Sequence, residues 1–311
     1  MLGMIIFASY FLKILMVFTK TSEVSSLTLI DRVGCYAQLF KIRLTSFVVI
    51  SAIFGYFIGA PAYNISEIIF LIIGGFLVTC ASNAFNQSIE RNHDKLMKRT
   101  QNRPLPTGKI SLVEAILVAS IFSVIGVSML WLLNPLSGIL GLLAIVMYVV
   151  LYTPLKRVST ISVFVGAFPG AIPPMLGWVA ATGSFSLEAG ILFAIQFVWQ
   201  FPHFWAIAWK VNDEYTKAGF KMLPFGKKNT ATAVIILLSV VILLVSGFIP
   251  EMVGMCGRIT TVGLAILSLL MLYPAIKLVQ TKDDKFALRV LLMSYLYLIV
   301  SLTVILIDRI I

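Results

Sequence analysis

The stretch NAFNQSIERNHDKLMKRTQNRPLP, residues 83–106, lies between two long apolar segments of this 311-residue chain. Within it, Asn86, Glu90 and Asp94 recur at four-residue steps. A helix turns about 100° and rises about 1.5 Å per residue, so this spacing predicts one stripe about 12 Å long. Amide and carboxylate oxygens are ligands that suit Mg²⁺. The three side chains are therefore predicted metal ligands and, with the metal, catalytic residues.

Basic side chains follow this stripe directly, at Lys95, Lys98, Arg99 and Arg103. Ammonium and guanidinium groups form strong hydrogen bonds with phosphate oxygens. Carboxylates that hold a metal, next to such a cluster, match the needs of a diphosphate ligand. The alternative interpretation is a solvated helix end that carries ordinary charges at the edge of a membrane.

The composition indicates a membrane protein. Hydrophobic residues make up 59% of the chain and charged residues only 12%, whereas soluble domains carry about 25% charged residues. The apolar runs are long and continuous, which predicts an all-α polytopic membrane protein and not a β-barrel. Nine spans are predicted, at residues 44–62, 66–86, 110–133, 136–153, 161–181, 187–209, 229–249, 258–278 and 288–309.

The net charge of +11 is explained by membrane topology, so a nucleic-acid partner is not required. Twenty-one of the 24 Lys and Arg residues fall in segments that emerge on one side. The positive-inside rule makes that side cytoplasmic, with the N-terminus inside and the C-terminus outside. We expect residues 1–43 to form an N-terminal cytoplasmic segment and residues 44–311 a single transmembrane domain. Whether the short apolar stretch 4–18 also spans stays open.

A second acidic segment, with Asp213 and Glu214, is predicted on the same side after the sixth span. Two such segments could hold Mg²⁺ on a diphosphate and neutralise the charge that develops as it leaves. If the leaving group is attached to an allylic prenyl chain, a carbocation results, and an apolar bundle would exclude water from it. Aromatic faces could stabilise that cation. The candidates near this side are Phe85, Tyr152, Phe201, Phe204, Trp205 and Tyr215.

Three motifs in order carry a family resemblance over most of the chain, from about Leu39 onward. They are the 86–106 stretch; Tyr152-Thr-x-x-Lys-Arg157 with residues 166–178; and Trp199-Gln-x-Pro-His-Phe204 with residues 213–224. Together they resemble the UbiA superfamily of membrane prenyltransferases, in particular the branch that farnesylates heme.

This resemblance implies a nine-helix UbiA-type bundle with a cytoplasm-facing cavity, in the bacterial cytoplasmic (inner) membrane. It implies Mg²⁺-dependent transfer of a farnesyl group from farnesyl diphosphate to a vinyl group of heme B, with addition of water, giving heme O and diphosphate. The implied partners are these substrates, the lipid bilayer and a downstream heme A synthase or terminal oxidase.

The resemblance also implies roles for individual residues. Asn86, Glu90 and Asp94 match the first metal motif of the family. Asp213 and Glu214 are adjacent, where the family shows Asp-x-x-x-Asp, so which of them binds metal stays open. Diphosphate binding is assigned to the basic residues Lys41, Arg43, Arg99, Arg103, Lys156 and Arg157.

His203 is a predicted heme contact, because histidine is a common axial ligand of heme iron. Two alternative functions stay open from the sequence. One is a quinone-type aromatic polyprenyltransferase. The other is a membrane transporter, which broken helices and charges at mid-membrane depth would support. The charges here gather at one side instead, and only the fifth predicted span, with Pro169, Pro173 and Pro174, is heavily interrupted by proline.

Overall fold

A computed structural model describes residues 28–310, and the predicted stretch 4–18 lies outside the described residues. Within the described part, nine helices are long and apolar enough to cross a membrane, which confirms the all-α polytopic prediction. The spanning helices are α3 (Ile42–Gly59), α4 (Ile65–Asp94), α5 (Leu112–Leu133), the continuous α6–η1–α7 (Pro135–Val146, Met147–Tyr152, Thr153–Val158), α8 (Ser162–Thr182), α9 (Leu187–Lys210), α11 with α12 (Thr230–Ser246, Ile249–Met252), α13 (Arg258–Thr281) and α14 (Asp284–Ile310). Three short helices lie outside the spans: α2 (Leu29–Leu39), α10 (Asn212–Lys217) and the single turn η2 (Pro224–Gly226).

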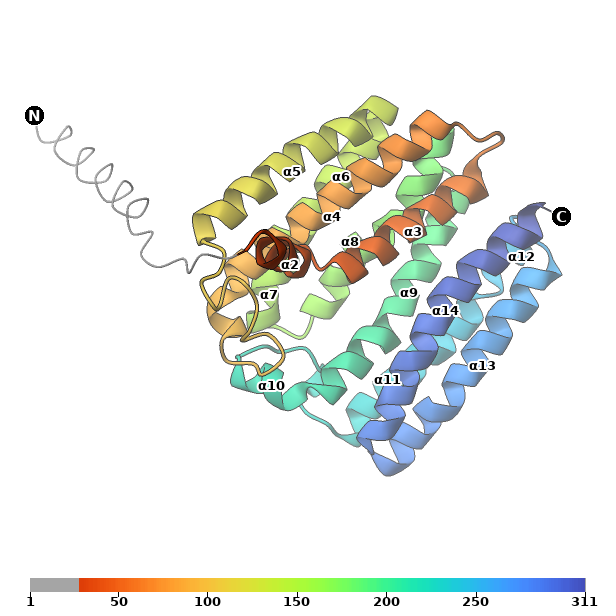
Figure 1. Cartoon of the computed structure of the whole chain (residues 1–311). Helices are drawn as coiled ribbons and strands as arrows, with labels where there is room; N and C mark the ends of the chain where they lie inside the picture. Colours follow the sequence, from red (N-terminus) through yellow and green to blue (C-terminus); the bar gives the residue numbers. More distant parts are fainter. Residues whose placement is uncertain (1–27, 311) are drawn as a thin grey trace, which may run out of the picture.

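The helices form two groups joined by α9 (Figure 1). In one group, α4 packs on α5 and α3 packs on α8. In the other, α13 packs on both α11 and α14. Helix α9 contacts α8 on one side and α11 and α14 on the other. Short α2 lies across the start of the first group, and α10 lies at the same end of the bundle (Figure 1).

Glycine brings the backbones of α3 and α8 together. A Cβ atom at Gly55 would overlap the carbonyl group of Pro174, and one at Gly177 would overlap the carbonyl oxygen of Ala52. Helices in a membrane gain no hydrophobic drive from packing on each other, so small residues that allow close van der Waals contact are their main means of association. The α3–α8 pair is therefore a rigid wall of the bundle.

Helix α4 is the main departure from the predicted span boundaries. The apolar run predicts an end near residue 86, but the helix continues to Asp94. Asn64 begins it by accepting a hydrogen bond from the Ser66 amide at 3.0 Å, as an N-cap residue does. The last two turns of α4 are polar, so the apolar run that predicted the span did not include them. Their helical geometry places Asn86, Glu90 and Asp94 on one stripe, as their spacing predicted.

A π-helical turn, η1, interrupts the fourth span and was not predicted. Pro154 follows it and has no amide hydrogen to donate, which favours a local change in helix pairing. The Thr153 hydroxyl donates to the Tyr148 carbonyl at 2.7 Å. Single π-turns of this kind occur frequently at functional sites. The turn carries Tyr148 and Tyr152, which line the cavity described below, and Thr153 follows it at the start of α7 and contacts Asn86.

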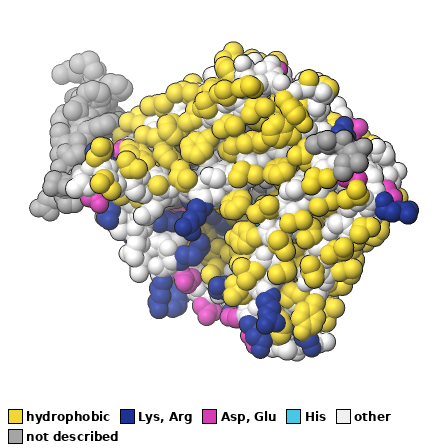
Figure 2. All heavy atoms as spheres, turned by 45° about the vertical axis from the view of Figure 1, so that its right-hand side comes forward, with side chains coloured by type: hydrophobic (Ala, Val, Ile, Leu, Met, Phe, Trp, Pro, Cys, Tyr) yellow, Lys and Arg dark blue, Asp and Glu magenta, His cyan; other side chains and the backbone are white. Residues whose placement is uncertain are grey.

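The outer surface is that of an integral, multi-pass membrane protein. Large apolar side chains such as Ile121, Val124 and Leu132 are exposed on the outside of the helices. Figure 2 shows this apolar surface running across the bundle, with Lys and Arg side chains gathered mainly toward its lower end. We call the end that carries residues 91–109, 156–157 and 210–228 the basic end.

Candidate active site at the basic end of the bundle

The stripe of α4 is buried, which argues against a solvated helix end. Asn86 is 1% exposed, Glu90 5% and Asp94 1%. A carboxylate in such a position is costly unless hydrogen bonds or opposite charges compensate it. Each of the three side chains is in fact held by a basic residue from another part of the chain.

Asn86 is oriented by two partners. Lys41 Nζ donates to its Oδ1 at 3.1 Å, and its Nδ2 donates to the Thr153 hydroxyl at 3.1 Å. Lys41 has a left-handed backbone with φ of 49°, at the point where α3 begins. This conformation is uncommon outside glycine and is enriched at functional sites. Burial, together with the nearby cations Arg103 and Lys156, lowers the pKa of Lys41 to about 7.

The two carboxylates form ion pairs. Lys156 Nζ pairs with Glu90 Oε1, and Arg103 NH1 lies 2.9 Å from Asp94 Oδ2. The other oxygen of Asp94, Oδ1, is buried and has no hydrogen-bond partner among the described groups. A buried anionic oxygen without a partner is costly and calls for a ligand. This oxygen therefore fits a bound cation.

The second acidic segment reaches the same end of the bundle through α10. Glu214 Oε2 accepts a hydrogen bond from the Arg99 amide at 3.1 Å, and the Arg99 guanidinium lies near Tyr215. The segment after α4 and the α10 segment are thus in direct contact. Asp213, in contrast, is exposed. Among residues 28–310, no three His, Cys, Asp or Glu side chains lie close enough to form a ready metal cluster.

His93 connects α4, α7 and the segment after α10. Its Nε2 lies 3.1 Å from Arg157 NH1, and its Nδ1 lies 2.9 Å from the Ala218 carbonyl oxygen. A guanidinium group can only donate, so Nε2 accepts and Nδ1 carries the hydrogen given to Ala218. The Lys221 amide also donates to the Lys156 carbonyl at 2.7 Å. These bonds fix the second acidic segment relative to the Glu90–Lys156 pair.

His93→Leu is expected to loosen residues 211–223, since it removes both hydrogen bonds, each worth about 1 kcal/mol. Hydrogen–deuterium exchange of a peptide from this segment should be faster, and turnover about tenfold lower. His93→Gln keeps a donor and an acceptor and is the matched control, expected to stay near the wild type. Equal exchange in both variants would show that His93 does not hold the segment.

Three predicted site residues are not brought to the acidic side chains. Arg43 is exposed and makes no described contact with them. Arg157 contacts His93 instead. The ring of His203 stacks on Trp199, and its Nδ1 lies 2.8 Å from the Ser294 hydroxyl of α14.

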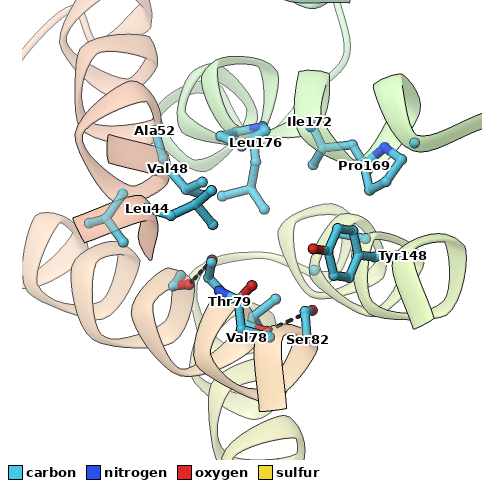
Figure 3. Close-up of a pocket in the computed structure, with 18 of the residues that line it drawn as sticks. Leu44, Val48, Ala52, Val78, Thr79, Ser82, Tyr148, Pro169, Ile172 and Leu176 are labelled. Carbon is cyan, nitrogen blue, oxygen red and sulfur yellow. Dashed lines mark hydrogen bonds between the residues drawn. The ribbon is translucent and has the colours of Figure 1, made fainter. Parts of the chain in front are cut away.

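An apolar cavity lies between α3, α4, η1, α8 and α9, and Asn83, one turn from the stripe, lines it. Figure 3 shows Leu44, Val48, Thr79, Tyr148 and Leu176 lining it from four elements. Its polar lining residues are largely satisfied by backbone. The Thr79 hydroxyl donates to the Gly75 carbonyl at 2.7 Å, and the Ser82 hydroxyl donates to the Val78 carbonyl at 2.9 Å. The wall presented to a ligand is therefore mainly apolar.

Of the aromatic candidates, Tyr152 and Phe204 line this cavity, whereas Phe201 and Trp205 line a separate groove beside α11. Three further residues of the site had no predicted role: Tyr148, Asn83 and Thr153. Asn83 lies one turn before Asn86, lines the cavity and donates to the Phe40 carbonyl at 3.2 Å. Its spacing from Asn86 was a usable signal, and Thr153 belongs to the Tyr152-Thr-x-x-Lys-Arg157 motif, although no role was assigned to it. The π-turn that presents Tyr148 left no signal in the sequence.

With this geometry in place, comparison with known proteins identifies the family. The model of the UbiA prenyltransferase family matches residues 48–299. The chain belongs to the UbiA prenyltransferase family. It is 46% identical over 279 residues to a protoheme IX farnesyltransferase of Christiangramia forsetii, covering 88% of this chain and 93% of the relative. It is 44% identical to one of Cytophaga hutchinsonii, covering 88% and 97%.

Solved structures with the UbiA fold agree. A digeranylgeranylglyceryl phosphate synthase superposes with a TM-score of 0.76 at 19% identity, covering 90% of this chain and 99% of that one. A UbiA homologue of Archaeoglobus fulgidus bound to GPP and Mg²⁺ superposes with a TM-score of 0.60 at 16% identity, covering 87% and 99%. At these identities the likeness shows the fold alone. As a member of this family, the chain is a membrane prenyltransferase.

Proposed function

We propose that this UbiA-family chain transfers a farnesyl group from farnesyl diphosphate to a vinyl group of heme B. One observation supports the proposal: a buried stripe of oxygen-bearing side chains, paired with cations, continues along α4 into residues that line an apolar cavity. The names of relatives at 44–46% identity supply the acceptor, heme. In the reaction the C1–O bond of the donor breaks, a C–C bond forms to the vinyl carbon, and water adds a hydroxyl group and releases a proton. The products are heme O and diphosphate.

The side chains around Asp94 Oδ1, the oxygen that has no hydrogen-bond partner among the described groups, suit Mg²⁺. Asn86, Glu90 and Asp94 would hold it, with Glu214 and Asp213 from the second segment. Mg²⁺ keeps several waters and needs few protein ligands, so a ready cluster of three acids is not required. When bound, it would neutralise negative charge on the departing diphosphate.

The basic residues are proposed to bind the diphosphate in different ways. Three of them already surround the stripe: Lys41, Lys156 and Arg103. A bound diphosphate could replace the carboxylates as the anionic partner of these cations. Arg99 sits at the contact of the two acidic segments and could close over the ligand. Arg43 and Arg157 are proposed to act at longer range, through the positive field at the mouth of the cavity.

The cavity would hold the prenyl chain and keep water away from the cation. Tyr148 and Tyr152 face it from η1, and their ring faces could stabilise positive charge near the mouth. The proposed heme contact of His203 requires the porphyrin to reach the α9–α14 interface, because that is where its ring lies.

We propose that the active site lies on the cytoplasmic side of a bacterial inner membrane, and the distribution of basic residues supports this through the positive-inside rule. We propose residues 1–43 as a cytoplasmic segment before a single domain at 44–311. Heme O would pass to a heme A synthase or directly to a terminal oxidase.

The test is transfer by the purified full-length protein in detergent or vesicles. Farnesyl diphosphate, Mg²⁺ and heme B are supplied, and extracted hemes are analysed by mass. We expect a heme heavier by one farnesyl and one hydroxyl group, and none when Mg²⁺ is chelated. Transfer to 4-hydroxybenzoate but not to heme would instead support a quinone-type enzyme. No transfer to any acceptor would refute the proposal and favour the alternative function of a membrane transporter.

A further inference from the structure

The face of α4 that carries the metal ligands continues along the cavity. From Asp94 and Glu90 the stripe passes through Asn86, Asn83 and Thr79 to Gly75, which all lie three or four residues apart. Asn83, Thr79 and Gly75 line the cavity. Leu71, one turn further on, is fully buried in an apolar cluster with Val78 and Leu130 and does not line the cavity. Gly75 is thus the last residue of this stripe that faces the cavity.

The depth from the ligand stripe to Gly75 can be measured along the helix. Gly75 lies eleven positions before Asn86, which corresponds to about 16 Å at the helical rise per residue. Helix α3 gives a similar depth when it is measured from Lys41, which contacts Asn86. Ala52 is the last residue of α3 that lines the cavity and lies eleven positions after Lys41, and Tyr56, one turn further on, is buried. The faces of α3 and α4 that line the cavity therefore end at a similar depth, which we call the floor of the cavity.

This depth accommodates a fifteen-carbon chain and is slightly too short for a twenty-carbon chain. Three backbone bonds of an extended polypeptide span about 3.3–3.6 Å, and on this scale the main chains of geranyl, farnesyl and geranylgeranyl groups reach ~8, ~13 and ~17 Å. A farnesyl chain that starts near Asn86 would end about 3 Å before the level of Gly75. A geranylgeranyl chain would press against the floor.

Gly75 also differs from the other glycines of the cavity. A Cβ atom at Gly166 would meet the Tyr152 ring and one at Gly170 would meet the Gln200 side chain, so these glycines make room for neighbours. A Cβ atom at Gly75 would meet nothing within 4 Å. Its missing side chain is therefore not needed for packing, and it leaves space in the cavity.

We propose that Gly75 is a specificity-determining residue, whose missing side chain gives the cavity the depth needed for a farnesyl group. The inference rests on the proposed prenyl-transfer function. A side chain at this position would fill the far end of the cavity and leave the diphosphate end unchanged. Gly75→Leu should therefore accept geranyl diphosphate and discriminate against farnesyl diphosphate.

The test compares wild type, Gly75→Ala, Gly75→Leu and Gly190→Leu. Gly190 is a helical glycine of α9 that is exposed, has nothing within 4 Å of its Cβ position and lies outside the cavity, so it controls for the change in helix propensity. Equilibrium binding of the sulfur-bridged analogues of geranyl, farnesyl and geranylgeranyl diphosphate is measured with Mg²⁺ by calorimetry. Competition among the three diphosphates in heme transfer is measured by mass.

For Gly75→Leu, we expect the farnesyl-to-geranyl ratio to fall by about 10–100-fold in both readouts, because a few methylene groups in an apolar pocket discriminate by that much. Gly75→Ala should shift it in the same direction by less, and Gly190→Leu should match the wild type. An unchanged ratio in folded Gly75→Leu or Gly75→Ala would overturn the inference. If the wild type binds the analogues but transfers nothing to heme, the proposed acceptor fails while the binding ratio still decides the role of Gly75.

Discussion

Glu90→Gln and Asp94→Asn are each expected to lower turnover by about 10²–10³-fold or more, while the protein stays folded in the membrane. The reason is that each change removes an anionic oxygen from the proposed metal site, where the leaving diphosphate would be stabilised. Loss of one preorganised group that stabilises developing charge costs on that order. Heme transfer at saturating substrates is the measurement.

Glu114→Gln is the matched control for both variants. Glu114 also lies at the basic end and pairs with an arginine, since its Oε1 is 2.7 Å from Arg32 NH2. It has no part in the stripe or the cavity lining, so its variant should stay within about twofold of the wild type. Near-normal turnover in both Glu90→Gln and Asp94→Asn would remove the metal assignment.

Gly177→Ala and Gly55→Ala are expected to destabilise the bundle most strongly. The added Cβ would overlap backbone atoms of the facing helix in each case, and backbone cannot rotate away as a side chain can. Overpacking of this kind costs about 1–3 kcal/mol, and more where main chain must move. Thermal unfolding in detergent should show a lower midpoint, and transfer should fall with it because α3 and α8 wall the cavity.

Gly190→Ala serves as the control for that experiment. It has open space at the Cβ position, and alanine is favoured over glycine in a helix by about 1 kcal/mol. We expect an unchanged or higher midpoint. If Gly177→Ala and Gly55→Ala unfold at the wild-type temperature, the close approach of α3 and α8 does not hold the bundle together.

Much of the fold was predictable because the bilayer dictates it. A span needs about 20 apolar residues, and the nine apolar runs correspond to the nine candidate spans within residues 28–310. The boundaries were less accurate where a helix leaves the apolar region and stays helical, as α4 does over its last eight residues. The π-turn after Val146 could not be foreseen, since Pro154 fits a kink or an end equally well.

The residues of the α4 stripe could be predicted from the sequence, but the ion pairs and hydrogen bonds that they form could not. Four-residue spacing placed Asn86, Glu90 and Asp94 on one stripe without knowledge of the fold. Which cation meets which acid depends on the approach of distant segments, so the Lys156–Glu90 and Arg103–Asp94 pairs required the structure. The same holds for His93, whose partners Arg157 and Ala218 lie 64 and 125 residues away in sequence. Local sequence carries no signal for such contacts.

In the proposed function, acids from α4 and from the α10 segment share one metal–diphosphate site. Titration of Mn²⁺ followed by electron paramagnetic resonance, with the sulfur-bridged farnesyl diphosphate analogue present, tests it most directly. The wild type should bind Mn²⁺ more tightly with the analogue than without it. Asp94→Asn and Glu214→Gln should each weaken that binding, and Glu114→Gln should not. Binding of equal strength in all four proteins would contradict the account.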